Sequence, residues 1–312
     1  MSNAEQLNRE DLRQVFNAQK KKTRRQNFIK GILFLLPSIV LFSLFLFYPM
    51  LKTLYLSFFL TDMAGAPTVF VGLNNYIQLY ESQIFRKSFI STFLFVLYIV
   101  PATIIIALLL AVLANEKLKG IGFFRTMYSS TMGISVAAGS IFWMYLFNPS
   151  MGLLNEGLAV FGIDSIGWLT DPDWALVSIA LTTIWMNIGF TFLILLGGLQ
   201  SIDQSLYENA DIEGAGYFRK LLKITVPMLS PTLFFVFIVT IINAFQTFGQ
   251  IDILTKGGPQ YETNLIVYSI YREAFVNRQF GPASAQAVVL FVIILVMTII
   301  QFKFAERKVH YQ

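Results

Sequence analysis

The chain has 312 residues, of which 55% are hydrophobic and only 13% are charged, and its formal net charge is +5. About a quarter of an ordinary soluble domain is charged, so this composition indicates a membrane protein. The lack of cysteine excludes disulfides and thiolate metal sites, and a single histidine, His310, argues against histidine-based metal or acid–base chemistry. Membrane proteins carry Lys and Arg on cytoplasmic loops, so the basic balance does not indicate a nucleic-acid partner.

Six stretches lack Asp, Glu, Lys and Arg and are long enough, at about 20 residues each, to cross the hydrocarbon core as helices. They are residues 31–51, 88–114, 126–147, 174–199, 228–251 and 283–302. The sequence therefore predicts an all-α integral membrane protein with six transmembrane helices. Residues 1–30 are predicted as an N-terminal arm, 31–303 as the transmembrane domain and 304–312 as a tail.

The positive charges predict the orientation. Of the 23 Lys and Arg residues, 17 lie in the arm, the loops at 115–125 and 200–227, and the tail. Because such residues concentrate on the cytoplasmic side, we expect the arm, both of these loops and both termini in the cytoplasm. The loops at about 52–87, 148–173 and 252–282 are then external.

The spans contain no ionisable side chain, and the chain has no G-x-x-x-x-G-K-[ST] phosphate-binding loop. Ion-coupled carriers usually bury ionisable groups in the membrane, so a secondary carrier is a weaker interpretation. A membrane enzyme would need His, Cys or paired carboxylates at the membrane surface. If the chain drives transport, the energy must come from another subunit.

The cytoplasmic loop at 203–227 is the most informative segment. Ser205 and Glu208 fit a capping box, which predicts a short helix that begins at Ser205. Gly214 is suited to end that helix because glycine adopts the left-handed conformation without a steric cost. Pro227 then begins the fifth span.

A second helix is predicted between Gly214 and Pro227. Its apolar face comprises Phe218, Leu221, Leu222 and Thr225, and its basic face comprises Arg219, Lys220 and Lys223. Such a helix is typical of a segment on the membrane surface.

Polar residues recur at helical spacing in two spans and form one stripe on each. The stripes are Thr183, Asn187 and Thr191 in the fourth span and Thr240, Asn243, Thr247 and Gln250 in the fifth. Uncharged hydroxyls and amides suit a neutral, hydroxyl-rich solute, and Trp185, Phe245 or Phe248 could stack on a sugar ring. The alternative is that these polar groups hydrogen-bond between helices.

In the third span, the pairs Gly133 with Ala137 and Ser135 with Gly139 have the spacing that permits close helix packing. Pro101 is expected to kink the second span.

The loop also resembles the EAA motif of permeases in ATP-binding-cassette (ABC) importers, E-A-A-x-x-x-G followed by I-x-x-P. The matching residues are Glu208, Ala210, Gly214, Ile224 and Pro227, whereas Asn209 and Glu213 depart from the motif. Residues 71–76, 197–200 and 256–259 are similar, in order along the topology, to sugar permeases of the maltose-transporter type.

The resemblance implies a coupling helix that docks on a cytoplasmic ATPase. The residues it assigns to coupling are Glu208, Ala210, Gly214, Ala215, Ile224 and Pro227. Glu208 would offer a carboxylate to a basic partner, or it would serve only in the capping box. The resemblance also places the solute-contacting positions on the fourth and fifth spans.

The implied function is one permease subunit of a binding-protein-dependent, ATP-driven importer of oligosaccharides or related neutral sugars in the bacterial inner membrane. The implied partners are a second homologous permease, two ATPase subunits and an extracellular solute-binding protein. The chain itself would bind no cofactor, and ATP with Mg²⁺ would lie on the ATPases. An importer of a phosphorylated polyol, such as glycerol phosphate, is the alternative, although an anion would favour a basic residue in the spans.

Overall fold

The computed structural model describes residues 3–116 and 118–305, which form two units, residues 1–55 and 56–312. The first unit holds helix α1 (Asn3–Phe42), a π-helical segment η1 (Ser43–Phe47) and most of α2 (Tyr48–Leu56). Helix α1 runs from the predicted arm at 1–30 into the first predicted span. Nearly all of the predicted tail at 304–312 lies outside the described residues.

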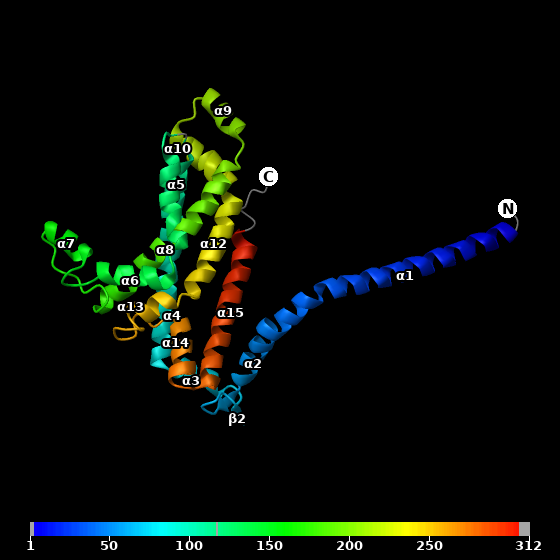
Figure 1. Cartoon of the computed structure of the whole chain (residues 1–312), viewed down its shortest axis with the longest axis horizontal. Helices are drawn as coiled ribbons and strands as arrows, with labels where there is room; N and C mark the ends of the chain where they lie inside the picture. The colour runs from blue at the N-terminus through cyan, green and yellow to red at the C-terminus, as the bar shows by residue number, and fades with distance from the viewer. Residues whose placement is uncertain (1–2, 117, 306–312) are drawn as a thin grey trace. The chain divides into compact units, whose positions relative to one another are not determined.

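The second unit is mostly helical (Figure 1). Its elements are β1 (Phe59–Thr61), β2 (Pro67–Phe70), α3 (Asn74–Glu81), α4 (Gln83–Asn115), α5 (Ile121–Ser129), the 3₁₀ turn η2 (Ser130–Gly133), α6 (Val136–Leu146), α7 (Leu153–Val160), α8 (Pro172–Gln200), α9 (Gln204–Ile212), α10 (Tyr217–Lys220), the π-helical η3 (Leu221–Thr225), α11 (Val226–Met228), α12 (Ser230–Phe245), α13 (Gly249–Leu254), α14 (Ile266–Tyr271), the π-helical η4 (Arg272–Val276) and α15 (Phe280–Ala305).

Five helical stretches among the described residues are long and apolar enough to cross a membrane. They are Gln26–Leu56, Gln83–Asn115, Pro172–Gln200, Ser230–Leu254 and Phe280–Lys303. Each contains most or all of a predicted span. The second of them continues through Pro101 without interruption.

The predicted third span, 126–147, differs from a single continuous helix. Its residues belong to α5, η2 and α6, and only α6 is an uninterrupted apolar helix, of 11 residues. The interruption has a local cause, because Ser135 takes an extended conformation and its side chain accepts a hydrogen bond from the Ala138 N–H, as an N-cap does. Hydrophobicity alone does not show such a break.

The prediction of a wholly α-helical protein was wrong in the loop at 52–87. Strands β1 and β2 form an antiparallel hairpin in which Phe59 pairs with Phe70 and Leu60 with Val69. The two phenylalanine rings lie edge to face with centroids 5.2 Å apart. Asn75 at the start of α3 donates hydrogen bonds to the carbonyls of Ser57 and Phe59, which fixes the hairpin to the bundle.

The core consists of two clusters, both centred on the packing of α4 against α8. In the cluster nearer the α9 end, Ala107, Ala111 and Ala114 lie on one face of α4 and are almost fully buried. Their small side chains permit close approach of α8, where Phe192 and Leu195 fill the remaining space. Helices α12 and α15 complete the bundle (Figure 1).

Three glycines show where helices approach most closely. A Cβ at Gly189 in α8 would lie 2.5 Å from the Thr131 hydroxyl oxygen and 2.9 Å from the Met132 nitrogen, in the η2 turn. A Cβ at Gly198 would lie 2.7 Å from side-chain atoms of α12. At Gly139 it would overlap the end of Met186, which confirms close packing there, whereas Gly133 has open space and does not serve this role.

Candidate functional site: the elbow between α8 and α12

Helix α9 begins one residue earlier than predicted and has a different cap. Asp203, not Ser205, is the N-cap, and its carboxylate accepts a hydrogen bond of 2.9 Å from the Ser205 N–H. That bond lowers the pKa of the Asp203 carboxyl below its ordinary value. The predicted capping box is therefore wrong, because Ser205 is the second residue of the helix and its own amide is the one that is capped. Glu208 has no capping role.

The end of α9 matches the prediction at Gly214, which has φ of +72°. The Ala215 N–H donates to the Ala210 carbonyl at 2.9 Å, and the Gly214 N–H donates to the Asp211 carbonyl at 3.0 Å. These two bonds make up a Schellman motif, which satisfies the last carbonyls of the helix. A sharp turn therefore follows α9.

The chain then returns to the bundle through α10, η3 and α11. On the predicted apolar face Thr225 is buried and Leu221 is half-buried, whereas Phe218 and Leu222 are 75% and 65% exposed, so this face stays a prediction for the membrane surface. Residues Leu221–Thr225 are π-helical, which widens the turn beyond the 3.6 residues on which the prediction rested. We call residues 203–227 the elbow.

Two side-chain interactions join α9 to the returning segment. The Tyr207 and Thr225 hydroxyl oxygens lie 2.9 Å apart and share a hydrogen bond, and Lys220 Nζ lies 2.7 Å from Asp211 Oδ1. Sequence analysis did not identify Tyr207, and it assigned Thr225 only to an apolar face. The two hydroxyl-bearing residues are 18 positions apart in the sequence. Only the turn at Gly214 brings them close together.

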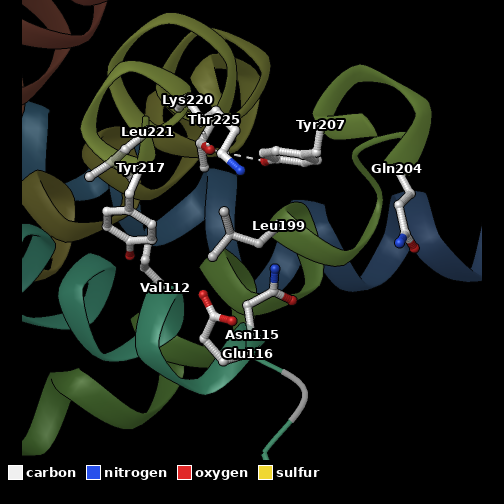
Figure 2. A pocket seen from close by; sticks show the side chains of 10 residues that line it. All are labelled: Val112, Asn115, Glu116, Leu199, Gln204, Tyr207, Tyr217, Lys220, Leu221 and Thr225. Carbon is white, nitrogen blue, oxygen red and sulfur yellow. Dashed lines mark hydrogen bonds between the residues drawn. The ribbon is translucent and has the colours of Figure 1, made fainter. Parts of the chain in front are cut away.

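A partly open cavity of about 350 Å³ lies between the elbow and the ends of α4 and α8 (Figure 2). Its lining residues are Val112, Asn115, Glu116, Leu199, Gln204, Tyr207, Tyr217, Lys220, Leu221 and Thr225. Leu206 and Tyr207 also pack against the neighbouring hydrophobic cluster. Contact between α9 and the bundle therefore includes these two side chains.

The residues assigned to coupling lie together on the elbow but differ in exposure. Glu208 is exposed and has no hydrogen bond or ion pair among the described residues. Ala210 is buried, and Ala215, Ile224 and Pro227 are half-buried. An exposed carboxylate beside a tightly turned backbone is a chemically suitable contact for a basic partner.

The fourth-span stripe lies on α8. Thr183 is buried, and its hydroxyl donates to the Ile179 carbonyl in the same helix. Thr191 is buried as well, whereas Asn187 is half-buried. Asn187 is therefore the member of this stripe that remains accessible within the chain.

The fifth-span stripe divides between α12 and α13. Thr240 is buried and Asn243 is exposed. The Thr247 hydroxyl donates to the Asn243 carbonyl, and Gln250 donates to the Met186 sulfur at 3.5 Å. The Gln250 contact joins the fifth-span stripe to α8, because Met186 belongs to that helix.

The three aromatic candidates have different surroundings. Phe245 is fully buried against Phe93, so it packs the core and has no free face for a sugar ring. Trp185 stacks on Phe142 at a centroid distance of 5.8 Å. Phe248 contacts Tyr268 and Tyr271. Trp185 and Phe248 are partly exposed and remain predictions.

Residues 69–310 match the family described as binding-protein-dependent transport system inner membrane components. The chain belongs to this family. Its members are components of transport systems and not enzymes. The match therefore confirms the permease family that the sequence motifs indicated. It also agrees with the apolar helices described above.

Among curated relatives, the permease protein UgpA of the sn-glycerol-3-phosphate transport system of Yersinia pestis bv. Antiqua is 35% identical over 281 residues, which cover 90% of this chain and 95% of the relative. The UgpA protein of Agrobacterium fabrum is 36% identical over 288 residues, which cover 91% and 97%.

Among solved structures, a chain of a bacterial ABC transporter involved in import of the acidic polysaccharide alginate aligns with a TM-score of 0.77 and 25% identity, covering 93% of this chain and 99% of the other. A second structure of a bacterial alginate ABC transporter, in complex with an alginate pentasaccharide-bound periplasmic protein, gives 0.76 and 24% over 92% and 96%. The fold of this chain is thus that of an ABC permease.

Proposed function

We propose that this chain is one permease subunit of an ATP-driven, binding-protein-dependent importer of oligosaccharides or related neutral sugars. The observation that carries the proposal is the elbow: in a chain of this family, the motif residues form a short helix ended by a left-handed glycine, with an exposed carboxylate on Glu208. A second permease, two ATPases and an extracellular binding protein complete the proposed assembly.

The proposed topology has six spans, with residues 126–147 as an interrupted third span and both termini in the cytoplasm. The elbow then lies on the cytoplasmic side, where an ATPase can reach it. Closure of the ATPase pair, with ATP and Mg²⁺ bound there, would displace α9. The bundle would rock between inward-open and outward-open states, which is a rigid-body mode of conformational change.

The proposed solute pathway uses the accessible members of the two polar stripes, Asn187 and Asn243. Thr183, Thr191, Thr240, Thr247 and Gln250 support these positions or contribute directly as the helices move. Uncharged amides and hydroxyls can hydrogen-bond sugar hydroxyls without the cost of a buried charge. Replacement of Asn243 with Leu should change solute selectivity, and an unchanged transport profile would remove Asn243 from the pathway.

A phosphorylated polyol is the second candidate solute, and the names of the UgpA relatives favour it. The apolar spans of this chain offer no basic side chain to a phosphate, so a partner subunit would have to supply one. Uptake of radiolabelled sn-glycerol-3-phosphate and of a neutral maltooligosaccharide, measured in the same vesicles, separates the two candidates.

Coupling is tested by Gly214→Asp in the complete transporter. We expect the complex to assemble and uptake to fall to background, because the carboxylate and the added Cβ disturb the turn at φ of +72°. Normal ATP-dependent uptake would contradict the coupling role. Uptake by the purified chain without any ATPase would contradict the whole assembly and would favour a secondary carrier.

A further inference from the structure

The turn between the two arms of the elbow has little packing of its own. A Cβ added at Gly214 or at Gly216 would meet no atom within 4 Å. Beyond the two backbone hydrogen bonds of the Schellman motif, the angle between α9 and the returning segment therefore depends on side-chain interactions across the elbow. Two such interactions exist among the described residues, the Asp211–Lys220 ion pair and the Tyr207–Thr225 hydrogen bond.

These two interactions differ in their surroundings. The Asp211 side chain is 61% exposed and that of Lys220 is 24% exposed, and ion pairs in contact with water contribute little. Thr225 is only 6% exposed and Tyr207 is half-buried. A hydrogen bond with less access to water is stronger and directional, so the Tyr207–Thr225 bond is the firmer of the two links.

The position of this bond also matters. Tyr207 immediately precedes Glu208, the exposed carboxylate of the coupling helix, and Thr225 lies two residues before Pro227, where the chain enters the bundle. Figure 2 shows the two side chains pointing toward each other across the cavity. Movement of α9 therefore reaches the base of α12 by two routes: along the backbone through the open turn, or directly through the two hydroxyls.

We propose that the Tyr207–Thr225 hydrogen bond is a strut that transmits displacement of α9 to α12. Tyr207 and Thr225 are then positioning residues that act without touching either solute or nucleotide. The proposal rests on the proposed function, because it assumes that an ATPase displaces α9.

The test uses the complete transporter, purified with its co-isolated partners and reconstituted in lipid. Since the chain has no native cysteine, two pairs of spin labels can be introduced cleanly. One pair, at Ile212 and Leu222, reports the elbow. The other, at Leu109 on α4 and Phe235 on α12, reports the bundle; all four side chains are exposed. Distances are measured without nucleotide and after addition of ATP and Mg²⁺.

In the unsubstituted chain, ATP with Mg²⁺ should shift both distances. With Tyr207→Phe, Thr225→Val or both, the elbow distance should broaden and the population with the shifted bundle distance should fall by about three- to tenfold, the factor that one hydrogen bond of ordinary strength supports. The double variant should be no worse than Thr225→Val alone, because Thr225→Val already removes the bond to Tyr207, together with the hydrogen bond of 3.4 Å from the Thr225 hydroxyl to the Lys220 carbonyl. Thr225→Ser, which keeps the hydroxyl, should restore the response.

Tyr217→Phe is the matched control, because Tyr217 lines the same cavity but its hydroxyl makes no hydrogen bond among the described residues. It should behave as the unsubstituted chain does. An intact bundle response in Tyr207→Phe, or additive losses in the double variant, would overturn the strut and leave the proposed function standing. If the unsubstituted complex contains no ATPase and does not respond to ATP, both proposals fail together.

Discussion

Gly189 is a residue at which a single added methyl group should destabilise the packing of two helical elements. Its added Cβ would meet the Met132 nitrogen and, at 3.0 Å, the Ser129 carbonyl oxygen, and backbone atoms cannot move aside as a flexible side chain can. The Gly189 N–H also donates to the Thr131 hydroxyl at 3.0 Å. The glycine therefore holds the η2 turn directly against α8.

Gly189→Ala should lower the stability of the purified complex by about 1–3 kcal/mol, the usual cost of overpacking. Gly197→Ala, on the same helix, has no atom within 4 Å of the new Cβ and should leave the apparent melting temperature unchanged or slightly raised. Both are measured by thermal unfolding in detergent. Equal melting temperatures for the two variants would contradict the close approach at η2.

Thr92 fixes the segment before α14 to α4. Its hydroxyl accepts a hydrogen bond of 3.0 Å from the fully buried Ile266 N–H and donates to the Ser88 carbonyl. Ser88 in turn accepts a hydrogen bond of 2.7 Å from the Asn264 amide. This chain of bonds orders the segment that follows the 256–259 motif.

Thr92→Val should destabilise the protein by about 1–3 kcal/mol, because it leaves the Ile266 N–H buried without an acceptor. Thr103→Val is the control on the same helix, since Thr103 is equally buried but its hydroxyl has no partner among the described residues. That change should be neutral or stabilising. A larger loss for Thr103→Val than for Thr92→Val would contradict this account.

At the scale of the element, α9 depends on a cap whose strength changes with pH. The hydrogen bond from the Ser205 N–H lowers the folded-state pKa of the Asp203 carboxyl. A lowered pKa means that the folded state prefers the ionised form, so this contribution is complete above the unfolded-state pKa and is lost as the pH falls through the lowered value.

Protection of the Ser205 amide against hydrogen exchange, corrected for the intrinsic pH dependence of the exchange rate, should therefore fall below a pH of about 4, near the ordinary pKa of an aspartate. Asp203→Asn keeps a capping oxygen that does not titrate. It should retain protection without the acid-dependent loss, whereas Asp203→Ala should lose protection at every pH. Identical pH profiles for the original chain and Asp203→Asn would exclude the carboxylate as the source.

Sequence reasoning found the long helices because their cause is local: about 20 apolar residues without charge are sufficient to define each one. It also located the Gly214 turn, because the left-handed conformation strongly favours glycine. It could not find Asp203 as the cap against the competing Ser205, because the choice depends on where the first turn begins. The Tyr207–Thr225 contact and the burial of Phe245 depend on tertiary packing, and no local pattern in a single sequence indicates that packing.

At the scale of the whole molecule, the distribution of Lys and Arg predicts which loops face the cytoplasm. Single cysteines in the cysteine-free chain provide the test. Phe161→Cys, in an external loop by this prediction, should react with a membrane-impermeant maleimide in intact spheroplasts; Phe161 is 82% exposed. Glu213→Cys, on the elbow, should react only after permeabilisation. The reverse pattern would invert the topology and place α9 beyond the reach of ATP.

The interrupted helix at residues 121–146 restricts what can surround this chain. Met132 and Ile134 at the break are exposed in the described structure, at 58% and 36%. Acyl chains offer no hydrogen bonds, so backbone groups freed by a break at membrane depth must meet protein or water. With residues 126–147 crossing the membrane as proposed, this side of the subunit cannot be part of its lipid-facing perimeter. In that topology it faces a neighbouring polypeptide or a hydrated lumen.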